Sequence, residues 1–396
     1  MSRARRPVYL NQGGIICTLG ADLANVERNL FAVQEHSFLT TTDHYSPGQP
    51  QSLGQVPLEL PAVTIPCEDT RNNRMLAAAV SPLLPAIDKL KSRLGRQRIG
   101  IVIGTSTSGI AEGESALTRV DNQIQLADGY RYTSQELSAP TRFLSNWLDV
   151  AGPCWTVSSA CTSGGKALTS AARLLDLGVC DVVIAGGVDT LCRMTVGGFS
   201  SLFVTADTPC NPFSRNRSGT NIGEGAGVFI LSREPGPVRL AGFGESSDAY
   251  HISSPHPQGI GAHDAIVRAL DMAGLKSEDI DYLNLHGTAT VQNDLMEGLA
   301  VNRVFGNEVA CSSTKPLTGH TLAAAGAIEA MLCWLLLQRD DGLLPPHLWD
   351  GQRDPEIPLL NGLGRADLGR PVKAAMSSSF AFGGNNLSLI LVREES

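Results

Sequence analysis

The sequence predicts an α/β protein built from two similar halves. Short aliphatic runs alternate along the chain with helical patterns, which favours buried, largely parallel strands. In addition, GEGAGVFILSRE (223–234) recurs as GGNNLSLILVRE (383–394), and Gly, Ile, Leu, Arg and Glu coincide at a shift of 160 (383 − 223). We place the halves at 1–235 and 236–396. No low-complexity linker separates them, so we expect one shared core.

The clearest strands are short and end at Gly or His: RIGIVIG (98–104), DVVIA (181–185) and YLNL (282–285). Helical patterns follow at 166–177 and 263–274. VSSACTSGG and VACSSTKPLTG form a second parallel between the halves, because each is a small-residue strand end that leads into a helix. The apolar run 322–337 contains Glu329 and is too short for a membrane span, so we expect a buried helix.

Composition narrows the classes of function. A hydrophobic content of 42% with 18% charged residues is ordinary for a globular protein, and a net charge of −8 argues against binding to nucleic acid or to an anionic membrane. The basic opening is followed by PVYLNQGGIICTLG, which predicts a first strand and turn rather than a signal peptide.

The cysteines and glycines point to no cofactor. None of the nine cysteines forms a C-x-x-C pair, which favours reduced thiols and a cytoplasmic protein without a metal site. GEGAG precedes a strand rather than a helix, so it does not indicate a nucleotide site.

Cys161 is the candidate nucleophile. Trp155-Thr156-Val157 predicts a strand and the pattern from Lys166 a helix, so the thiol lies on the turn before a helix N-terminus. Unpaired N–H groups and the helix dipole favour a thiolate there, and the small neighbours allow a tight turn and close approach of a substrate. A buried structural thiol explains the local pattern equally well.

Two histidines lie where partners of such a thiol would be expected. His286 follows a strand at its C-terminal end, where ligands of α/β sheets collect. His320 directly precedes a helix, which favours its neutral form. The remaining histidines, including His251 in DAYHISSP, lie in polar or helical contexts that indicate structural roles.

Three kinds of chemistry combine Cys with His. A papain-like hydrolase fits the spacing of 125 (286 − 161), but it requires the Cys near the mature N-terminus. An α/β-hydrolase elbow requires glycines where Ser159 and Ser163 stand. The third is carbon–carbon bond formation by a thiol that is first acylated.

Five motifs together resemble the β-ketoacyl-ACP synthases of the thiolase superfamily: VSSACTSGG, LHGTAT followed by Asn293, Asp294 and Glu297, TKPLTGHTLAAAGAIEA, NPFSRNRSGTNIGEGAG and SSSFAFGGNN. The resemblance spans the chain and is strongest to the elongating, two-histidine class. The initiating class has Asn in place of the second His, and thiolases have a second Cys. The resemblance implies a thiolase-like fold of two duplicated halves in five αβαβα layers.

It also implies residue roles. Cys161 would carry the acyl chain, while His286 and His320 would donate hydrogen bonds to an enolate formed by decarboxylation of a malonyl thioester. Lys315 would give electrostatic support, with Glu329 and Phe380 as supporting residues. The N–H groups of Cys161 and Phe382 would form an oxyanion hole that the Phe382 ring gates. The remaining implied contacts are with the phosphopantetheine arm (Thr288, Thr290 and Ser253) and with the acyl chain (Thr107).

The implied partners are an acyl carrier protein and a second subunit, in a homodimer or in a heterodimer with a chain-length-factor-like homologue. Thr107 stands where elongating synthases often carry a bulky aliphatic residue, and the first strand is unusual for housekeeping enzymes. Both indicate a specialised aryl polyene or polyketide-like pathway. Housekeeping fatty-acid elongation is the alternative. A non-catalytic chain-length partner is a third possibility, but such subunits typically lack the nucleophile.

Overall fold

The computed structural model describes residues 6–32, 37–65, 68–120 and 123–394. Residues 1–5 at the start of the chain and Cys67 lie outside these ranges. Ten strands of the described chain form one mixed sheet in the order β12-β11-β13-β14-β10-β1-β9-β8-β4-β7. Its first five strands in sequence are β1 (Tyr9–Ile16), β4 (Ile99–Gly104), β7 (Cys154–Val157), β8 (Val182–Asp189) and β9 (Gly225–Ser232). The other five are β10 (Val238–Ser247), β11 (Tyr282–Asn284), β12 (Ala310–Ser312), β13 (Ala374–Ala381) and β14 (Asn385–Arg393).

The order of strands repeats itself from each edge to the centre. In one half β4 pairs in parallel with β7 and β8, and β9 runs antiparallel to β8 and β1. In the other half β11 pairs in parallel with β12 and β13, and β14 runs antiparallel to β13 and β10. The halves meet where β1 pairs antiparallel with β10. Strands β9 and β14 begin 160 residues apart (385 − 225), at the shift of the recurring sequence.

The expectation of a largely parallel sheet is wrong. Strand β1 pairs antiparallel with β9 and β10, β14 pairs antiparallel with β10 and β13, and β8 pairs antiparallel with β9. Aliphatic strands buried on both faces read the same in either direction, so the hydrophobic pattern could not reveal this.

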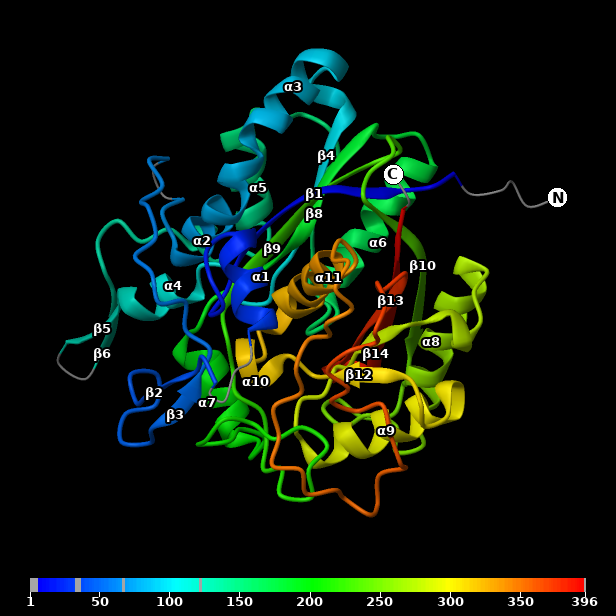
Figure 1. Ribbon diagram of the computed structural model, residues 1–396. Helices are drawn as coiled ribbons and strands as arrows, with labels where there is room; N and C mark the ends of the chain where they lie inside the picture. Colours follow the sequence, from blue (N-terminus) through cyan, green and yellow to red (C-terminus); the bar gives the residue numbers. More distant parts are fainter. Residues whose placement is uncertain (1–5, 33–36, 66–67, 121–122, 395–396) are drawn as a thin grey trace.

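Helices cover the sheet in layers. The long helices are α1 (Leu23–Phe31), α2 (Arg71–Val80), α3 (Leu84–Leu94), α5 (Ala139–Leu148), α6 (Ser163–Asp176), α7 (Arg193–Ser201), α8 (Ile260–Ala273), α9 (Val291–Phe305) and α11 (Ala325–Leu336). Figure 1 shows α11 at the centre of the molecule, with α2, α3 and α5 on one side and α8 and α9 on the other. Helices α6 and α11 contact each other between the two half-sheets, so the layers read αβαβα as the resemblance implied.

Alternation along the strands produces this layering. In β4, Ile101 and Ile103 face the core under α2 and α5, whereas Val102 faces the central layer. In β14, Leu389 faces the central layer and Ile390 faces the core under α8 and α9. Helices therefore cover both faces of each half-sheet. Polar side chains that form a functional site must then lie at the ends of the strands.

The remaining elements are short. They comprise α4 (Ile110–Ala116), α10 (Lys315–Thr318) and two hairpins, β2 (Thr40–Thr42) with β3 (Gln51–Leu53) and β5 (Leu117–Val120) with β6 (Gln123–Leu126). Two 3-10 turns, Leu322–Ala324 and Phe382–Gly384, lie beside the site. The predicted buried helix at 322–337 is confirmed, as the first of these turns followed by α11. Within the described ranges, no helix is long and apolar enough to cross a membrane.

Candidate active site

Cys161 lies on a sharp turn between β7 and α6. The residue before it, Ala160, has φ 52°, in the left-handed region that residues other than glycine rarely adopt. Ser163 fixes the turn, because its hydroxyl accepts from the N–H of Ser159 (2.8 Å) and donates to the carbonyl of Ala160 (2.6 Å). The small residues that precede Cys161 therefore serve the turn itself.

The two glycines that follow serve packing. A Cβ on Gly164 would lie 2.8 Å from the carbonyl oxygen of Ala323, and one on Gly165 would lie 2.3 Å from Cδ2 of Leu387. Both contacts are with the second half of the chain. Beyond the tight turn and the close approach of a substrate expected from sequence, these two glycines let α6 approach α11 and β14 closely.

The second half brings both histidines to this thiol. His286 follows β11, and His320 stands between α10 and the turn at Leu322–Ala324. Sγ of Cys161 lies 2.9 Å from Nε2 of His320. The imidazole rings of His286 and His320 are 5.4 Å apart at an interplanar angle of 87°. The ligand atoms of the three residues all lie within 4.8 Å of one another, so one substrate atom can contact all three.

The thiol is not a ready-made thiolate. Burial raises the pKa of Cys161 to about 12, while the charge of Lys315 and hydrogen bonds from the backbone N–H groups of Cys161 and Phe382 lower it less. The N–H group of Cys161 at the start of the helix lowers the pKa, in the predicted direction, but desolvation outweighs it and the net shift is upward. Proton removal must accompany the attack.

Both histidines are neutral. Burial, followed by the positive charge of Lys315, holds the pKa of His286 and of His320 well below the usual value. The neutral state predicted for His320 is confirmed, although burial is the cause rather than the helix dipole. Nζ of Lys315 lies 3.4 Å from Nδ1 of His286, and since an ammonium can only donate, the hydrogen of His286 is assigned to Nε2.

Lys315 is itself buried and paired. Its Nζ donates to Oε1 of Glu329 on α11 at 2.6 Å, and both side chains are almost fully inaccessible. Such a pair keeps a positive charge beside His286 without leaving it uncompensated in the core. Glu329, expected only as support, thus lies in direct contact with the lysine.

The cavity that ends at Cys161, His286 and His320 also contains the other expected aromatic and polar residues. Phe380, Phe382, Thr288, Thr290 and Ser253 line it. The ring of Phe380 lies 6.1 Å from that of His286, and the hydroxyls of Thr288 and Thr290 lie 3.0 Å apart. Nδ1 of His251 accepts from the N–H groups of Ser253 and Ser254 (3.2 Å each), so this histidine organises its loop.

Comparisons with known proteins identify the family. Residues 72–235 match "Beta-ketoacyl synthase, N-terminal domain" and residues 238–349 match "Beta-ketoacyl synthase, C-terminal domain". A 3-oxoacyl-[acyl-carrier-protein] synthase 2 of Rhizobium meliloti (strain 1021) is 33% identical over 80% of this chain and 79% of its own length. The chain belongs to the beta-ketoacyl synthase family. It is a condensing enzyme, a ketosynthase, and therefore an acyltransferase. The papain-like and α/β-hydrolase readings fall with this assignment.

Two further relatives cover nearly the whole ketosynthase chain. Nodulation protein E of Rhizobium leguminosarum bv. trifolii is 32% identical over 97% of this chain and 98% of its own. A chain from the structure of the ketosynthase ApeO in complex with its chain length factor ApeC, from Xenorhabdus doucetiae, is 43% identical, with a TM-score of 0.91 and 98% of each chain covered. The predicted thiolase-like fold is confirmed.

Thr107 is the one expected substrate contact of the ketosynthase that the structure does not bring into the cavity. Its hydroxyl donates to Oδ1 of Asp189 (2.9 Å) and accepts from the N–H of Thr190 (3.1 Å). Oδ2 of the same Asp189 accepts from the N–H of Ala323, just beyond His320. Thr107 thus belongs to a buried network that ties the end of β4 to the turn after His320.

Two acids on α9 hold the loop that carries His286, and sequence reasoning assigned them no role. Oε1 and Oε2 of Glu297 accept from the N–H groups of His286 (2.6 Å) and Gly287 (2.7 Å). Oδ1 of Asp294 accepts from the N–H of Ala289 at 3.2 Å. Burial raises the pKa of Glu297 to about 7 and that of Asp294 to about 6. The sequence does contain a signal for this role, because two acids three residues apart on a helix directly after the motif that carries His286 lie on one face of that helix.

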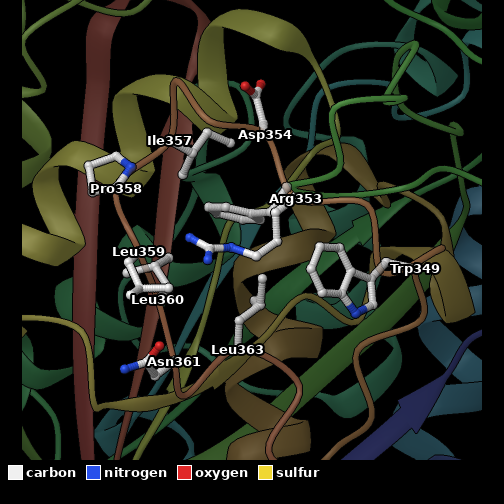
Figure 2. A pocket seen from close by; sticks show the side chains of 10 residues that line it. Trp349, Arg353, Asp354, Ile357, Pro358, Leu359, Leu360, Asn361 and Leu363 are labelled. Carbon is white, nitrogen blue, oxygen red and sulfur yellow. The ribbon is translucent and has the colours of Figure 1, made fainter.

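A second cavity lies apart from the site. Figure 2 shows Arg353 extending into it between Trp349 and Leu359. Phe213 also lines it, and none of the residues that line it lines the cavity of Cys161. It is therefore not part of the acyl-transfer site.

Among the described residues, the trio Cys161, His286 and His320 is the group whose spacing and ligand types would suit a soft metal ion such as Zn²⁺.

Proposed function

We propose that this ketosynthase catalyses the decarboxylative condensation of a malonyl thioester, presented by an acyl carrier protein, with an acyl chain held on Cys161. The observation that carries the proposal is the 2.9 Å approach of Sγ of Cys161 to Nε2 of a neutral, buried His320, with the ring of His286 5.4 Å from that of His320 and lining the same cavity.

The first step transfers the acyl chain. Nε2 of His320 takes the thiol proton as Sγ attacks the thioester carbonyl. A carbon–sulfur bond to Cys161 forms, the bond to the carrier sulfur breaks, and the carrier thiol leaves with the proton. The N–H groups of Cys161 and Phe382, which already contact the sulfur, stabilise the negative carbonyl oxygen. Because the thiol has a high pKa, removal of the proton during the attack avoids an isolated buried thiolate.

The second step forms the carbon–carbon bond. The malonyl carboxylate leaves as CO2, and its electron pair becomes an enolate. The enolate oxygen accepts from Nε2–H of His286 and from His320 in the tautomer that carries its hydrogen on Nε2 rather than on Nδ1. The enolate carbon attacks the thioester of Cys161, the bond to Sγ breaks, and one proton from water restores the thiol. Lys315 keeps Nδ1 of His286 occupied and its ring neutral, so that Nε2 can only donate.

For the pathway and the partner, we propose a specialised aryl polyene type of synthesis and assembly with a chain-length-factor-like subunit. The 43% identity to a chain of the ApeO–ApeC complex over 98% of both chains supports this. Housekeeping fatty-acid elongation is the second candidate, favoured by the 33% identical synthase. The third, a non-catalytic partner subunit, is disfavoured because the thiol and both histidines are present and in contact. All eight described cysteines are free. Free thiols are typical of a cytoplasmic protein, and this location stays a prediction.

Intact-mass measurement tests the proposal. Incubation with acyl-loaded carrier should add one acyl group to the protein, and the Cys161→Ala variant should gain none and should not condense. The His286→Ala and His320→Ala variants should lose the release of CO2 from malonyl carrier. Normal condensation by Cys161→Ala would refute the role of the thiol, and a mass that no donor changes would favour the non-catalytic subunit.

A further inference from the structure

Asp189, the last residue of β8, has a fully buried side chain that bonds to two separate segments. Its Oδ1 accepts from the hydroxyls of Thr105 and Thr107 and from the N–H groups of Ser106 and Thr107, at 2.8–2.9 Å. Its Oδ2 accepts from the N–H of Ala323 at 2.8 Å. One carboxylate of the first half therefore fastens the segment after β4 to a turn of the second half.

The turn that Asp189 holds comes directly after His320. Leu322 has φ 51°, a left-handed conformation that a leucine adopts only where the surrounding structure imposes it. The next residue, Ala323, donates its N–H to Asp189. A Cβ on Gly187, two residues earlier on β8, would lie 3.0 Å from the carbonyl oxygen of Ala323, so the end of β8 also packs against this backbone. The first half thus imposes the shape of the turn.

The ring of His320 has no second hydrogen bond that would orient it. In a nucleophile–base pair, a third group usually bonds the base and fixes its direction. Within the described ranges, Nδ1 of His320 is buried and has no hydrogen-bond partner. The 2.9 Å approach of its Nε2 to Sγ of Cys161 therefore depends on the backbone that carries the ring. The segment before β9 bonds the N–H and the carbonyl of His320, and Asp189 holds the turn that follows.

We propose that Asp189 is a positioning residue of the acyl transfer, which directs His320 at Cys161 through the backbone of the turn instead of through the imidazole ring. This inference rests on the proposed function. A displacement of about 1 Å at a reacting group can cost about a hundredfold in rate, so an anchor that only touches the backbone is sufficient to control the base.

Asparagine is the first variant that tests this role. N–H groups approach both oxygens of Asp189, so the Nδ2 hydrogens of an asparagine would meet a donor whichever way the amide is turned. Asp189→Ser is the second variant, because its hydroxyl is too short to take the place of both oxygens and it adds no bulk to the core. Circular dichroism and the melting temperature would establish that each variant is folded.

The measurement is the rate of Cys161 acylation between about pH 7 and 9, followed by timed intact mass with octanoyl-N-acetylcysteamine or octanoyl-loaded bacterial acyl carrier protein as donor. In the wild type, His320 takes the thiol proton and the departing thiol receives it, so the rate should be nearly independent of pH. In both Asp189 variants the displaced base should leave only the thiolate to react. Their rate should fall about a hundredfold at pH 7 and rise about tenfold per pH unit, because burial places the pKa of Cys161 at about 12.

Thr105→Val is the matched control, because it removes a hydrogen bond from the same carboxylate but leaves the bond between Oδ2 and Ala323. Its melting temperature should fall by a few degrees, while its acylation rate should stay within about threefold of the wild type and independent of pH. A folded Asp189 variant without the new pH dependence would overturn the proposal, and so would the same pH dependence in Thr105→Val.

The remaining outcomes also decide. If neither Asp189 variant folds, the residue serves stability alone and the positioning role is refuted, while the proposed function stands. If neither donor acylates the wild type, the proposed function itself fails and the role of Asp189 fails with it.

Discussion

The thiol of Cys161 contacts a base, His320, but it is not itself ionised. Its pKa of about 12 keeps it protonated at neutral pH, and the neighbour that can take the proton is His320, at 2.9 Å. Reactivity is therefore tied to the geometry of one hydrogen bond and to the arrival of an electrophile. A thiol of this kind resists adventitious oxidation better than a low-pKa nucleophile does.

Alkylation should report the raised pKa directly. In a Cys154→Ser background, which removes the thiol that is exposed among the described cysteines, the rate of Cys161 modification by iodoacetamide should rise about tenfold per pH unit between about pH 7 and 9, because the thiolate fraction grows with pH up to the pKa. Intact mass would follow the reaction, with Cys161→Ala as the blank. A plateau below pH 8 would contradict the raised pKa.

The choice of Cys161, His286 and His320 could be made from sequence, because strand ends and helix starts are local patterns. The protonation states could not be fully foreseen, since they depend on burial that arises only when the halves close around the site. Thr107 shows the same limit. Its motif was visible, but its hydroxyl is directed to Asp189 from a strand far away in sequence.

At the scale of elements, the approach of α6 to β4 depends on glycines. A Cβ on Gly104 at the end of β4 would lie 2.5 Å from the backbone carbon of Ser163, at the first residue of α6. The start of α6, directly after Cys161, thus packs against the backbone of β4 at Gly104, where there is no side chain. Local sequence explains the glycines near Cys161 as turn formers, and only the packed structure assigns them to the contacts between elements.

Gly104→Ala should separate these elements. We expect a loss of about 1–3 kcal/mol in the free energy of unfolding, because backbone atoms at this contact cannot move aside, together with slower acylation of Cys161. Gly197→Ala in α7 is the control, since no atom lies within 4 Å of its Cβ position, and it should be neutral or stabilising. Urea denaturation of both variants checks this, and equal stability of the two would contradict the packing argument.

At the scale of the molecule, the halves share their largest core. Leu168 of α6 and Phe229 of β9 belong to the same buried cluster as Leu332 of α11 and Leu389 of β14. Either half alone would expose this layer to water. The recurring twelve residues were enough to predict two halves, but the antiparallel pairing of β1 with β10 that joins them left no sign in sequence.

A chain cut at the proposed boundary should therefore not fold. Residues 1–235 expressed alone are expected to lack a cooperative thermal transition by circular dichroism, whereas the full chain should unfold in one, because the central layer has no partner in the fragment. Co-expression with residues 236–396 is the control that restores the layer. A cooperative transition in the isolated fragment would contradict a single shared core.

The repeated order of strands has one more consequence. Strands β7 and β12 hold the same place at opposite edges of the sheet, and the turn after each leads into the central pair of helices. One turn carries Cys161 and the other carries Lys315 and His320. Because the two halves repeat the same order of strands, the connection after β7 and the connection after β12 approach the active site from opposite edges of the sheet. In the proposed mechanism, the first connection holds the acyl chain on Cys161, and the second carries the residue that accepts and donates protons, His320.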